Sequence, residues 1–446
     1  MLMTPQEARD LARSTVAMTA ADEAEVLVGA DCSALTRFAN NRINQNVAEE
    51  NAIVSVRAVL GKRVGVASTN RLDTASLQAA CDAAVRAARV SPEDPSFPGL
   101  PGPSPLVDAN RALSATRDFD AEARAAAVGA IVAESASRGL TVAGKVRCAE
   151  HTVAVANSLG VDAGASLTGA QATVLSMGAA TGSGWASFLD ADASKLNAAA
   201  LGAEAADLAL RSADPQDLKP GDYQVVLAPE AVADIMDFLA YVGFSAKAYH
   251  EGRSFLSGHL GDSVMNERVS ILDDALAPFA MGLAFDYEGQ PKQRVSMIER
   301  GVAMSPVTDS YWAVKTGRTN TGHALPAPNS YGPMPLNVAM EPGEATMDEL
   351  IGSVQRGVYV TRFHYVNVED PISVLLTGMT RDGTFLIENG RLARPLKNLR
   401  FTQGAVEALA GCEGATSARK FVGTEEGACY VPGLLLAKFS FTGQTS

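Results

Sequence analysis

The feature that most constrains the fold is the second half of the chain, where short strand-like runs alternate with turns almost to the end. The runs are rich in β-branched and aromatic residues. Turn signals such as Arg381-Asp382-Gly383 and Glu388-Asn389-Gly390 separate them. This pattern predicts an antiparallel sheet or partial barrel with few helices, and not a doubly wound parallel sheet. The candidate strands are 223–227, 269–272, 295–299, 358–364, 373–379, 383–388 and 434–439.

The first half mixes helices with strands. Thr4, Pro5 and Glu7 form the signature of a helix start, and a helix is expected over 5–18. A second helix is expected after Asp73, because apolar residues recur there on one face of a 3.6-residue period. Those residues are Leu77, Ala80, Cys81, Ala84, Val85 and Ala88. Further helices are expected over 119–137, 192–211 and 229–242, and strands over 24–28, 34–38, 43–47, 53–60, 64–67, 152–156 and 161–167.

Proline and glycine positions suggest how the chain divides. Residues 91–107 are proline-rich and are expected to form a surface loop, since proline suits neither a helix interior nor a central strand. The segment 212–221 is the expected boundary between two domains. We therefore predict an α+β protein with a mixed α/β N-terminal domain, residues 1–215, and a β-rich C-terminal domain, residues 220–446.

Composition narrows the classes of function. The net charge is −13 and no basic patch stands out, so no nucleic-acid partner is expected. The sequence contains no run of 18 apolar residues, so no membrane span is expected. The N-terminal residues do not resemble a signal peptide, so a cytoplasmic location is expected. The five cysteines show no C-x-x-C spacing and predict neither a zinc knuckle nor a redox pair.

A metal site built on histidine must draw on five candidates: His151, His250, His259, His323 and His364. A zincin motif needs two histidines four residues apart on one helix face. The His-Glu pair here is His250-Glu251, and the next histidine, His259, falls on the opposite side of any continuous helix. A loop could still bring His250, Glu251 and His259 together as an alternative metal site. A polar surface loop is the simpler interpretation.

Two polar segments are candidates for ligand contacts. The first is the glycine-rich loop 316–324, where Arg318 or His323 could hold a carboxylate or carbonyl; a flexible surface loop is the alternative. The candidate substrate-binding residues are Arg318, Asn320, His323 and Asn337. The second is the basic run 391–400, which could bind an acidic partner but more simply protects a sheet edge from aggregation. No P-loop, dinucleotide-binding or G-x-S-x-G motif is present.

An ordered set of short landmarks in the C-terminal half resembles the TldD/PmbA family. The N-terminal half agrees more loosely through its helix–strand order and the turn Asn157-Ser158-Leu159-Gly160. The C-terminal landmarks are Phe255-Leu256-Ser257-Gly258, Leu272-Asp273-Asp274, Asp286-Tyr287-Glu288-Gly289, Thr321-Gly322-His323-Ala324, Glu341-Pro342-Gly343-Glu344, Gly357-Val358-Tyr359-Val360, Phe385-Leu386-Ile387-Glu388-Asn389-Gly390 and Asn398-Leu399-Arg400-Phe401.

The resemblance implies a zinc peptidase made of two kinds of subunit. The TldD-type subunit carries HExxxH on the first helix of the C-terminal domain and a cysteine ligand near the C-terminus. The PmbA (TldE) subunit lacks these residues and pairs with TldD around a chamber for unfolded peptide. Such proteins trim leader peptides and have been linked to DNA gyrase inhibition.

Aligned on that motif, the chain has lost the expected zinc ligands. Asp237 and Val242 stand at the two histidine positions, Phe238 stands at the glutamate, and Val422 stands at the cysteine. Cys429 could replace the cysteine only if the alignment slips. The resemblance therefore implies no metal in this chain and zinc in a TldD-like partner.

Three functions remain open at this point. The leading hypothesis is a PmbA/TldE-like noncatalytic subunit of a TldD/TldE-type zinc metalloprotease, a pseudo-protease that forms a heterodimer and takes part in proteolysis and peptide maturation. The second is an independent peptide hydrolase with a rewired site. The third is a self-associating, nonenzymatic peptide-binding scaffold, which would form a homodimer.

Overall fold

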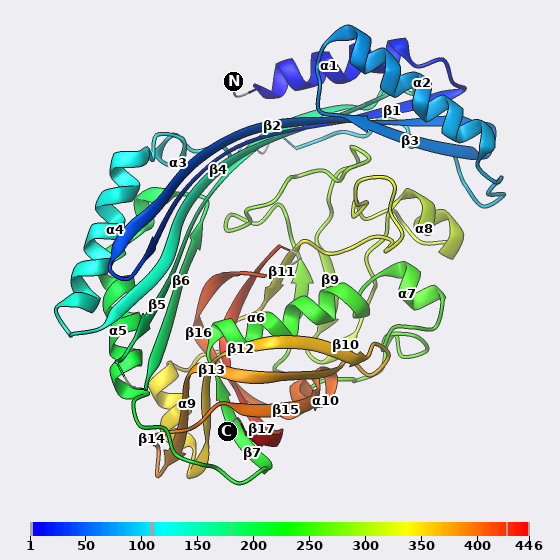
Figure 1. The fold of residues 1–446 in the computed structure, drawn as a ribbon. Helices are drawn as coiled ribbons and strands as arrows, with labels where there is room; N and C mark the ends of the chain where they lie inside the picture. The colour runs from blue at the N-terminus through cyan, green and yellow to red at the C-terminus, as the bar shows by residue number, and fades with distance from the viewer. Residues whose placement is uncertain (1–2, 108–110, 180, 425–426, 445–446) are drawn as a thin grey trace.

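The computed structural model describes residues 3–107, 111–179, 181–424 and 427–444. A long curved sheet from the N-terminal half arches over the C-terminal half (Figure 1). The two halves face each other across the concave side of this sheet. None of the helices in the described ranges is both long and apolar enough to cross a bilayer.

The N-terminal sheet has six strands in the described residues, in the order β3-β2-β1-β4-β5-β6, and every neighbouring pair is antiparallel. The strands are β1 (Glu23–Ala39), β2 (Arg42–Leu60), β3 (Arg63–Thr69), β4 (Thr141–Asn157), β5 (Asp162–Met177) and β6 (Ser183–Asp190). The helices are α1 (Pro5–Met18), α2 (Thr74–Val90), α3 (Ser114–Arg117), α4 (Ala121–Ala136) and α5 (Ala198–Arg211), with a short 3-10 turn η1 (Ala193–Lys195).

Four of these helices cover the convex face of the sheet (Figure 1). α1 and α2 pack against one part, over a core that includes Val26, Val28 and Val56, and α4 and α5 pack against the other. The capping box at Thr4 and Glu7 is present. All six apolar residues predicted on one face of α2 are buried. The opposite, concave face is turned toward the C-terminal half, and its residues line cavities there (Figure 1).

The strands of this sheet are longer than the sequence predicts. The runs expected at 24–28 and 34–38 are one strand, β1, and the runs expected at 43–47 and 53–60 are one strand, β2. Polar residues interrupt both patterns, but they lie opposite one another in the ladder. Ser33, for example, is paired with Glu49 and Asp31 with Asn51. The backbone pairing continues through the polar stretch, so the sheet reaches across the C-terminal half.

The C-terminal half is β-rich, as predicted, and includes a closed barrel. In the described residues β7, β12, β13, β15 and β17 pair in a ring, and β17 pairs back to β7. The pairings β7–β12 and β11–β17 are parallel, so the sheet is mixed and not purely antiparallel. The strands are β7 (Gly221–Leu227), β8 (Ile271–Asp273), β9 (Val295–Glu299), β10 (Val302–Ala303), β11 (Asn337–Met340), β12 (Arg356–Asp370), β13 (Leu375–Glu388), β14 (Arg391–Pro395), β15 (Leu399–Gly404), β16 (Cys412–Gly423) and β17 (Ala428–Gln444).

Short helices complete the C-terminal half. They are α6 (Pro229–Phe238), α7 (Ala246–His250), α8 (Ser310–Thr316), α9 (Met347–Ser353) and α10 (Ala405–Ala410). α6 continues into a π-helical turn, Leu239–Gly243. Its apolar face, with Val232, Ile235 and Met236, joins the main core of the barrel. The α+β class predicted from the sequence is confirmed.

The proline-rich stretch 91–107 is irregular, as expected, but it is not merely a surface loop. Phe97 and Leu100 are buried against Val59 of the sheet. Ser104 donates a hydrogen bond of 3.0 Å to Gln290 in the C-terminal half. The stretch therefore helps to hold the two halves together.

Candidate functional site

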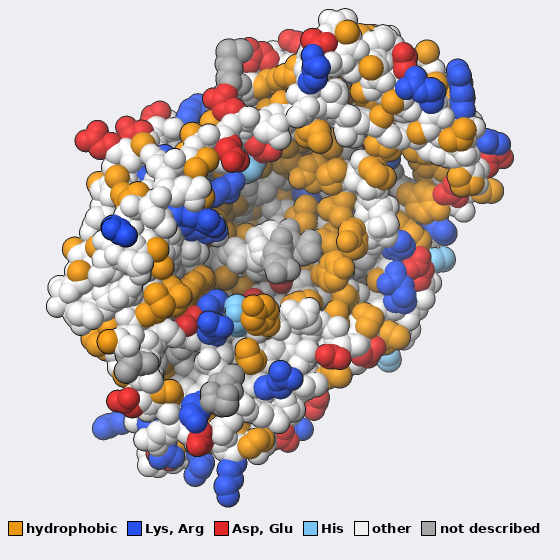
Figure 2. All heavy atoms as spheres, viewed as in Figure 1, with side chains coloured by type: hydrophobic (Ala, Val, Ile, Leu, Met, Phe, Trp, Pro, Cys, Tyr) orange, Lys and Arg blue, Asp and Glu red, His pale blue; other side chains and the backbone are white. Residues whose placement is uncertain are grey.

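Two cavities lie between the concave face of the N-terminal sheet and the C-terminal half. Their volumes are about 360 and 720 Å³. We call them the smaller and the larger cavity, and together the chamber. Figure 2 shows the hollow between the two halves, with hydrophobic side chains gathered on its wall. Residues shared by the two cavities are His151, Leu167, Met281, Gly282, Leu336 and Asn337.

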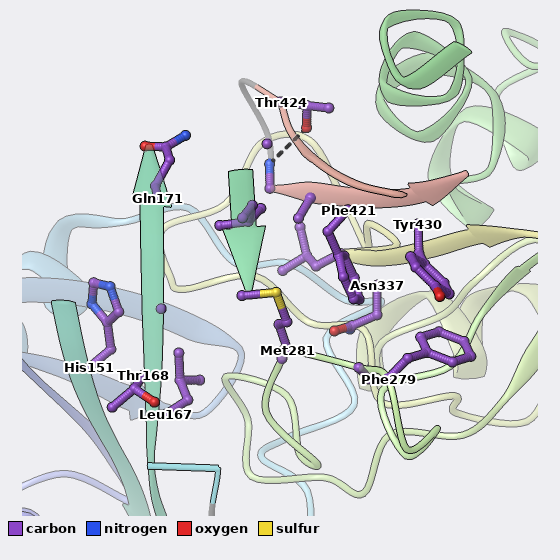
Figure 3. A pocket seen from close by; sticks show the side chains of 18 of the residues that line it. His151, Leu167, Thr168, Gln171, Phe279, Met281, Asn337, Phe421, Thr424 and Tyr430 are labelled. Atoms are coloured by element: carbon purple, nitrogen blue, oxygen red, sulfur yellow. Dashed lines mark hydrogen bonds between the residues drawn. The ribbon is translucent and has the colours of Figure 1, made fainter. Parts of the chain in front are cut away.

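The smaller cavity has an aromatic wall, formed by Phe279, Phe421 and Tyr430 (Figure 3). Phe421 and Tyr430 lie opposite each other on β16 and β17, with ring centroids 4.4 Å apart. The Arg419 guanidinium lies 4.3 Å from the centre of the Tyr430 ring, a cation–π contact. Opposite this wall, His151, Leu167, Thr168 and Gln171 come from the sheet, and Met281 lies between the two sides (Figure 3). Such a surface can hold apolar or aromatic side chains.

His151 and Asp31 form a polar pair on the side of the chamber that the N-terminal sheet provides. They lie opposite each other on β4 and β1, and the His151 Nδ1 atom is hydrogen-bonded to the Asp31 carboxylate. This hydrogen bond lowers the pKa of Asp31. The sequence shows both residues, but they lie 120 positions apart. Their contact depends on the register of two long strands, which no local pattern specifies.

Asn337, one of the predicted substrate-binding residues, lines both cavities. Its backbone N–H donates a 2.7 Å hydrogen bond to Asp273 Oδ2. Its side chain lies directly against Gly282, where a Cβ atom would stand 2.0 Å from Asn337 Oδ1. Because glycine at position 282 has no Cβ atom, the Asn337 side chain can lie at the junction of the two cavities.

His323 lies behind the chamber wall. It is fully buried, and its Nε2 atom is 3.1 Å from Asp273 Oδ1. Its Nδ1 atom is 2.9 Å from the Thr321 hydroxyl. Burial and the nearby charge of Lys292 lower the pKa of His323. His323 lines neither cavity, and its contacts tie its loop to β8.

The other loop candidates also lie away from the chamber. The Arg318 guanidinium is 5.0 Å from the centre of the Tyr249 ring. The Asn320 side chain accepts a hydrogen bond from the Gly322 amide, which stabilises the loop itself. Neither residue lines the two cavities. Of the four predicted substrate-binding residues, the structure brings only Asn337 to the chamber.

The helix that would carry a zinc motif is α6 with the turn that follows it. Phe238 and Val242 are partly buried and pack against the barrel core. Asp234, one turn before Phe238, is also on this helix. Burial and the neighbouring charge of Asp237 raise the pKa of Asp234 to about 7. The three residues expected from the sequence at the motif positions are therefore one carboxylate, Asp237, and two apolar side chains, Phe238 and Val242.

Cys429 lies close to the same helix but is a poor candidate for a zinc ligand. It is buried on β17, opposite Val422 on β16. Burial and the nearby carboxylates of Asp237, Asp234 and Asp273 raise the pKa of Cys429 well above its ordinary value. Zinc binds the thiolate, so zinc binding at Cys429 would have to release the proton that burial favours. The donor atoms around α6 do not fit a tetrahedral zinc site.

The alternative metal site is not assembled either. The His250 ring lies 5.8 Å from the Trp312 ring, Glu251 accepts a 3.0 Å hydrogen bond from Arg253, and His259 contacts Asp262 at 3.1 Å. Across the described ranges, no three His, Cys, Asp or Glu side chains come close enough to hold a metal ion together.

The basic run 391–400 also lies outside the chamber. Its first part is β14, which pairs with β13 on one side. Lys397 forms a 2.9 Å ion pair with Asp217. These contacts agree with a charged sheet edge.

Sequence models of one family match most of the chain. The PmbA/TldA metallopeptidase domain 1 matches residues 24–88, the central domain matches 103–213 and the C-terminal domain matches 220–443. The chain belongs to the PmbA/TldD metallopeptidase family. This confirms the resemblance seen in the sequence.

Several relatives of this PmbA/TldD chain are named metalloproteases. A metalloprotease of Methanothermobacter thermautotrophicus is 25% identical over 49% of this chain and 48% of its own length. A metalloprotease TldD homolog of Buchnera aphidicola is 26% identical over 46% and 43%. A zinc metalloprotease TldD homolog of Saccharolobus solfataricus is 26% identical over 44% of each. The matches span about half the length of these relatives.

Solved structures share the fold over nearly the whole chain. TldE from Thermococcus kodakarensis superposes with a TM-score of 0.88 at 18% identity, covering 97% of this chain and 99% of that one. A candidate modulator of a DNA gyrase from Thermotoga maritima superposes with a TM-score of 0.84 at 20% identity, covering 94% and 96%. At these identities the likeness concerns the fold.

Proposed function

We propose that this chain is a PmbA/TldE-like noncatalytic subunit of a zinc metalloprotease. It holds part of an unfolded or leader peptide in the chamber, while a TldD-like partner supplies the zinc and the hydrolytic chemistry. The single observation that supports this proposal is the make-up of α6 and the turn after it, which carry Asp237, Phe238 and Val242 where the family resemblance implies the zinc motif, while Cys429 is a buried thiol.

The chamber supports the peptide-binding part of the proposal. Its walls combine apolar strand residues with aromatic rings, and polar groups such as His151 and Asn337 are few and placed among them. Binding sites for small molecules and short peptides share this composition, in which apolar walls supply affinity and a few polar groups fix orientation. The chamber is thus suited to hold a ligand.

The direct test is reconstitution with a TldD-like zinc subunit from the same organism. An unfolded peptide with a fluorophore and a quencher at its ends reports cleavage. We expect no cleavage by this chain alone, and faster cleavage by the mixture than by the zinc subunit alone. Size-exclusion chromatography of the mixture should show a hetero-oligomer.

Three outcomes would count against the proposal. Cleavage by this chain alone would indicate an independent hydrolase. A stable homodimer that does not associate with the zinc subunit would favour a self-associating scaffold. If the complex cleaves the peptide no faster than the zinc subunit alone, this chain does not help to hold the peptide.

A further inference from the structure

Lys292 is a buried cation on the wall of the larger cavity. Only 6% of its surface is exposed, and its side chain is one of those that line the cavity. Its position is fixed from two sides. Its backbone N–H donates a 2.9 Å hydrogen bond to the Ala284 carbonyl, and Gly322 lies so close that a Cβ there would stand 2.9 Å from Lys292 Cα. These contacts fix the backbone of Lys292 beside the cavity.

The ammonium of Lys292 has no hydrogen-bond or ion-pair partner among the described residues, although Asp273 and Asp286 are near enough for their charges to interact with it. Both carboxylates are engaged elsewhere. Asp273 accepts a hydrogen bond from the backbone N–H of Asn337 and faces His323. Asp286 accepts hydrogen bonds from the backbone N–H groups of Glu288, Gln290 and Ala324.

An ammonium group has three donors. Lys292 Nζ is not among the fully buried unpartnered side-chain atoms of the described residues, so it keeps access to the cavity that Lys292 lines. The nearby Asp273 and Asp286 charges do not satisfy its donors. An acceptor that enters the cavity can do so. A charged acceptor forms a stronger hydrogen bond with an ammonium than a neutral one does.

The rest of the larger cavity is mostly apolar. Its volume of about 720 Å³ lies within the range of sites that enclose small ligands. Ile53 on β2 is 47% exposed and lines this cavity. Further apolar side chains come from both halves of the chain: Leu27, Val66, Val153, Leu167, Leu283 and Phe285. An occupant therefore needs apolar groups next to a single negative charge.

We propose that Lys292 binds a carboxylate of a peptide whose neighbouring apolar side chains occupy the larger cavity. This inference rests on the proposed function, because it assumes that the chamber holds peptide. A carboxylate carries one negative charge, which matches the one ammonium on this wall. The second basic side chain on this wall, His151, is already bonded to Asp31. The carboxylate can be the peptide C-terminus or a Glu or Asp side chain.

Three fluorescently labelled probes distinguish these sources. Each is an apolar hexapeptide rich in leucine and valine. The first has a free C-terminal carboxylate, the second has a C-terminal amide, and the third has the amide and one internal glutamate. Fluorescence anisotropy measures their affinity for the full-length native chain, so the comparison needs no variant. We expect one or both carboxylate probes to bind about 10-fold or more tightly than the fully amidated probe.

Variants then assign the preference to Lys292. Lys292→Met should remove the preference for the carboxylate, and Lys292→Arg should retain part of it because the charge remains. Lys315→Met is the matched control, since Lys315 contacts Tyr311 and Trp312 and lines neither cavity. It should bind all three probes as the native chain does.

Equal affinity of the native chain for all three probes overturns the assignment, and so does a failure of both carboxylate probes to bind. An unchanged preference in a folded Lys292→Met variant also overturns it. These outcomes do not depend on zinc or on cleavage. Loss of the carboxylate preference would leave the noncatalytic role intact, and cleavage by the chain alone would contradict that role without altering the probe result.

Discussion

Arg57 of the N-terminal sheet binds Glu288 of the C-terminal half across the junction, at 3.1 and 3.2 Å from its two terminal nitrogens. The same guanidinium binds Glu25 on β1 at 2.7 Å. All three side chains are largely buried, and burial raises the pKa of Glu25 to about 7. This cluster holds the sheet at a fixed place above the C-terminal half and thereby sets the height of the chamber.

Removing the cation should destabilise the whole molecule. Arg57→Ala leaves two buried carboxyl groups without their partner, and breaking a buried pair in this way costs about 3 to 5 kcal/mol. Unfolding in urea, followed by circular dichroism, measures the loss. Arg63→Ala is the control, because its ion pair with Glu93 is exposed and should contribute less than about 1 kcal/mol. Similar losses in the two variants would show that the junction does not depend on Arg57.

The acidic helix α6 predicts a pH dependence of stability. The ordinary pKa of Asp234 is 3.8, and burial with the nearby Asp237 charge raises it to about 7. Between these values the folded chain keeps a proton that the unfolded chain has lost, so this group lowers stability as the pH rises. Asp234→Asn removes the effect. The fall in unfolding free energy from pH 4 to pH 7 should become shallower by about 1 to 4 kcal/mol, since a tenfold change in proton affinity corresponds to about 1.4 kcal/mol.

Urea unfolding at several pH values tests this expectation. Glu299→Gln, at an exposed position on β9, is the control and should leave the pH profile unchanged. A parallel profile for Asp234→Asn and the native chain would mean that the Asp234 carboxyl does not hold its proton in the folded state.

The close contact of Gly282 with Asn337 predicts a local effect on the chamber. In Gly282→Ala the added methyl group must displace the Asn337 side chain, at an expected cost of about 1 to 3 kcal/mol. Affinity for the peptide probes should fall as well, because Asn337 lines both cavities. Gly352→Ala is the matched control, since nothing lies near its Cβ position on α9 and alanine favours a helix by about 1 kcal/mol. If Gly282→Ala leaves the stability and the affinity for the peptide probes unchanged, Asn337 is not part of the binding surface.

The aromatic wall predicts a preference for apolar and aromatic peptide side chains. Tyr430→Ala removes a ring that contacts Phe279 and Phe421 and should weaken binding of an aromatic peptide about 3- to 10-fold. Tyr365→Ala is the control, because Tyr365 is exposed on β12 and lines neither cavity. Anisotropy titrations with a tryptophan-containing probe compare the two. Equal affinities of the Tyr430→Ala and Tyr365→Ala chains for this probe would show that the peptide does not bind against the aromatic wall.

Much of the fold was predictable because its signals are local. The period of α2 and the capping box of α1 depend on residues a few positions apart, and so do the turns of the C-terminal half. The two long strands β1 and β2 were predicted as shorter pieces, because polar residues such as Asp31 and Glu50 look like breaks when the partner strand is not known. Closure of the barrel through β17 and β7 depends on contacts between the two ends of the C-terminal half.

The candidate site was less predictable for the same reason. Asn337 was a candidate and lies in the chamber, but Arg318, Asn320 and His323 stabilise their own loop or face other residues. Lys292 follows a turn and looks like an ordinary surface lysine in the sequence. Its burial results from packing against Gly322 and from the sheet above it, and both are separated from it along the chain.

The measurement that tests the central claim most directly is the zinc content of this chain. The chain is purified without a partner, dialysed against zinc-containing buffer, dialysed again until it is free of unbound zinc, and analysed by inductively coupled plasma mass spectrometry. The residues on α6 and the buried thiol of Cys429 predict far less than one zinc per chain, with no change when Cys429 is replaced by serine. One zinc per chain, lost in Cys429→Ser or Asp237→Asn, would contradict the noncatalytic role.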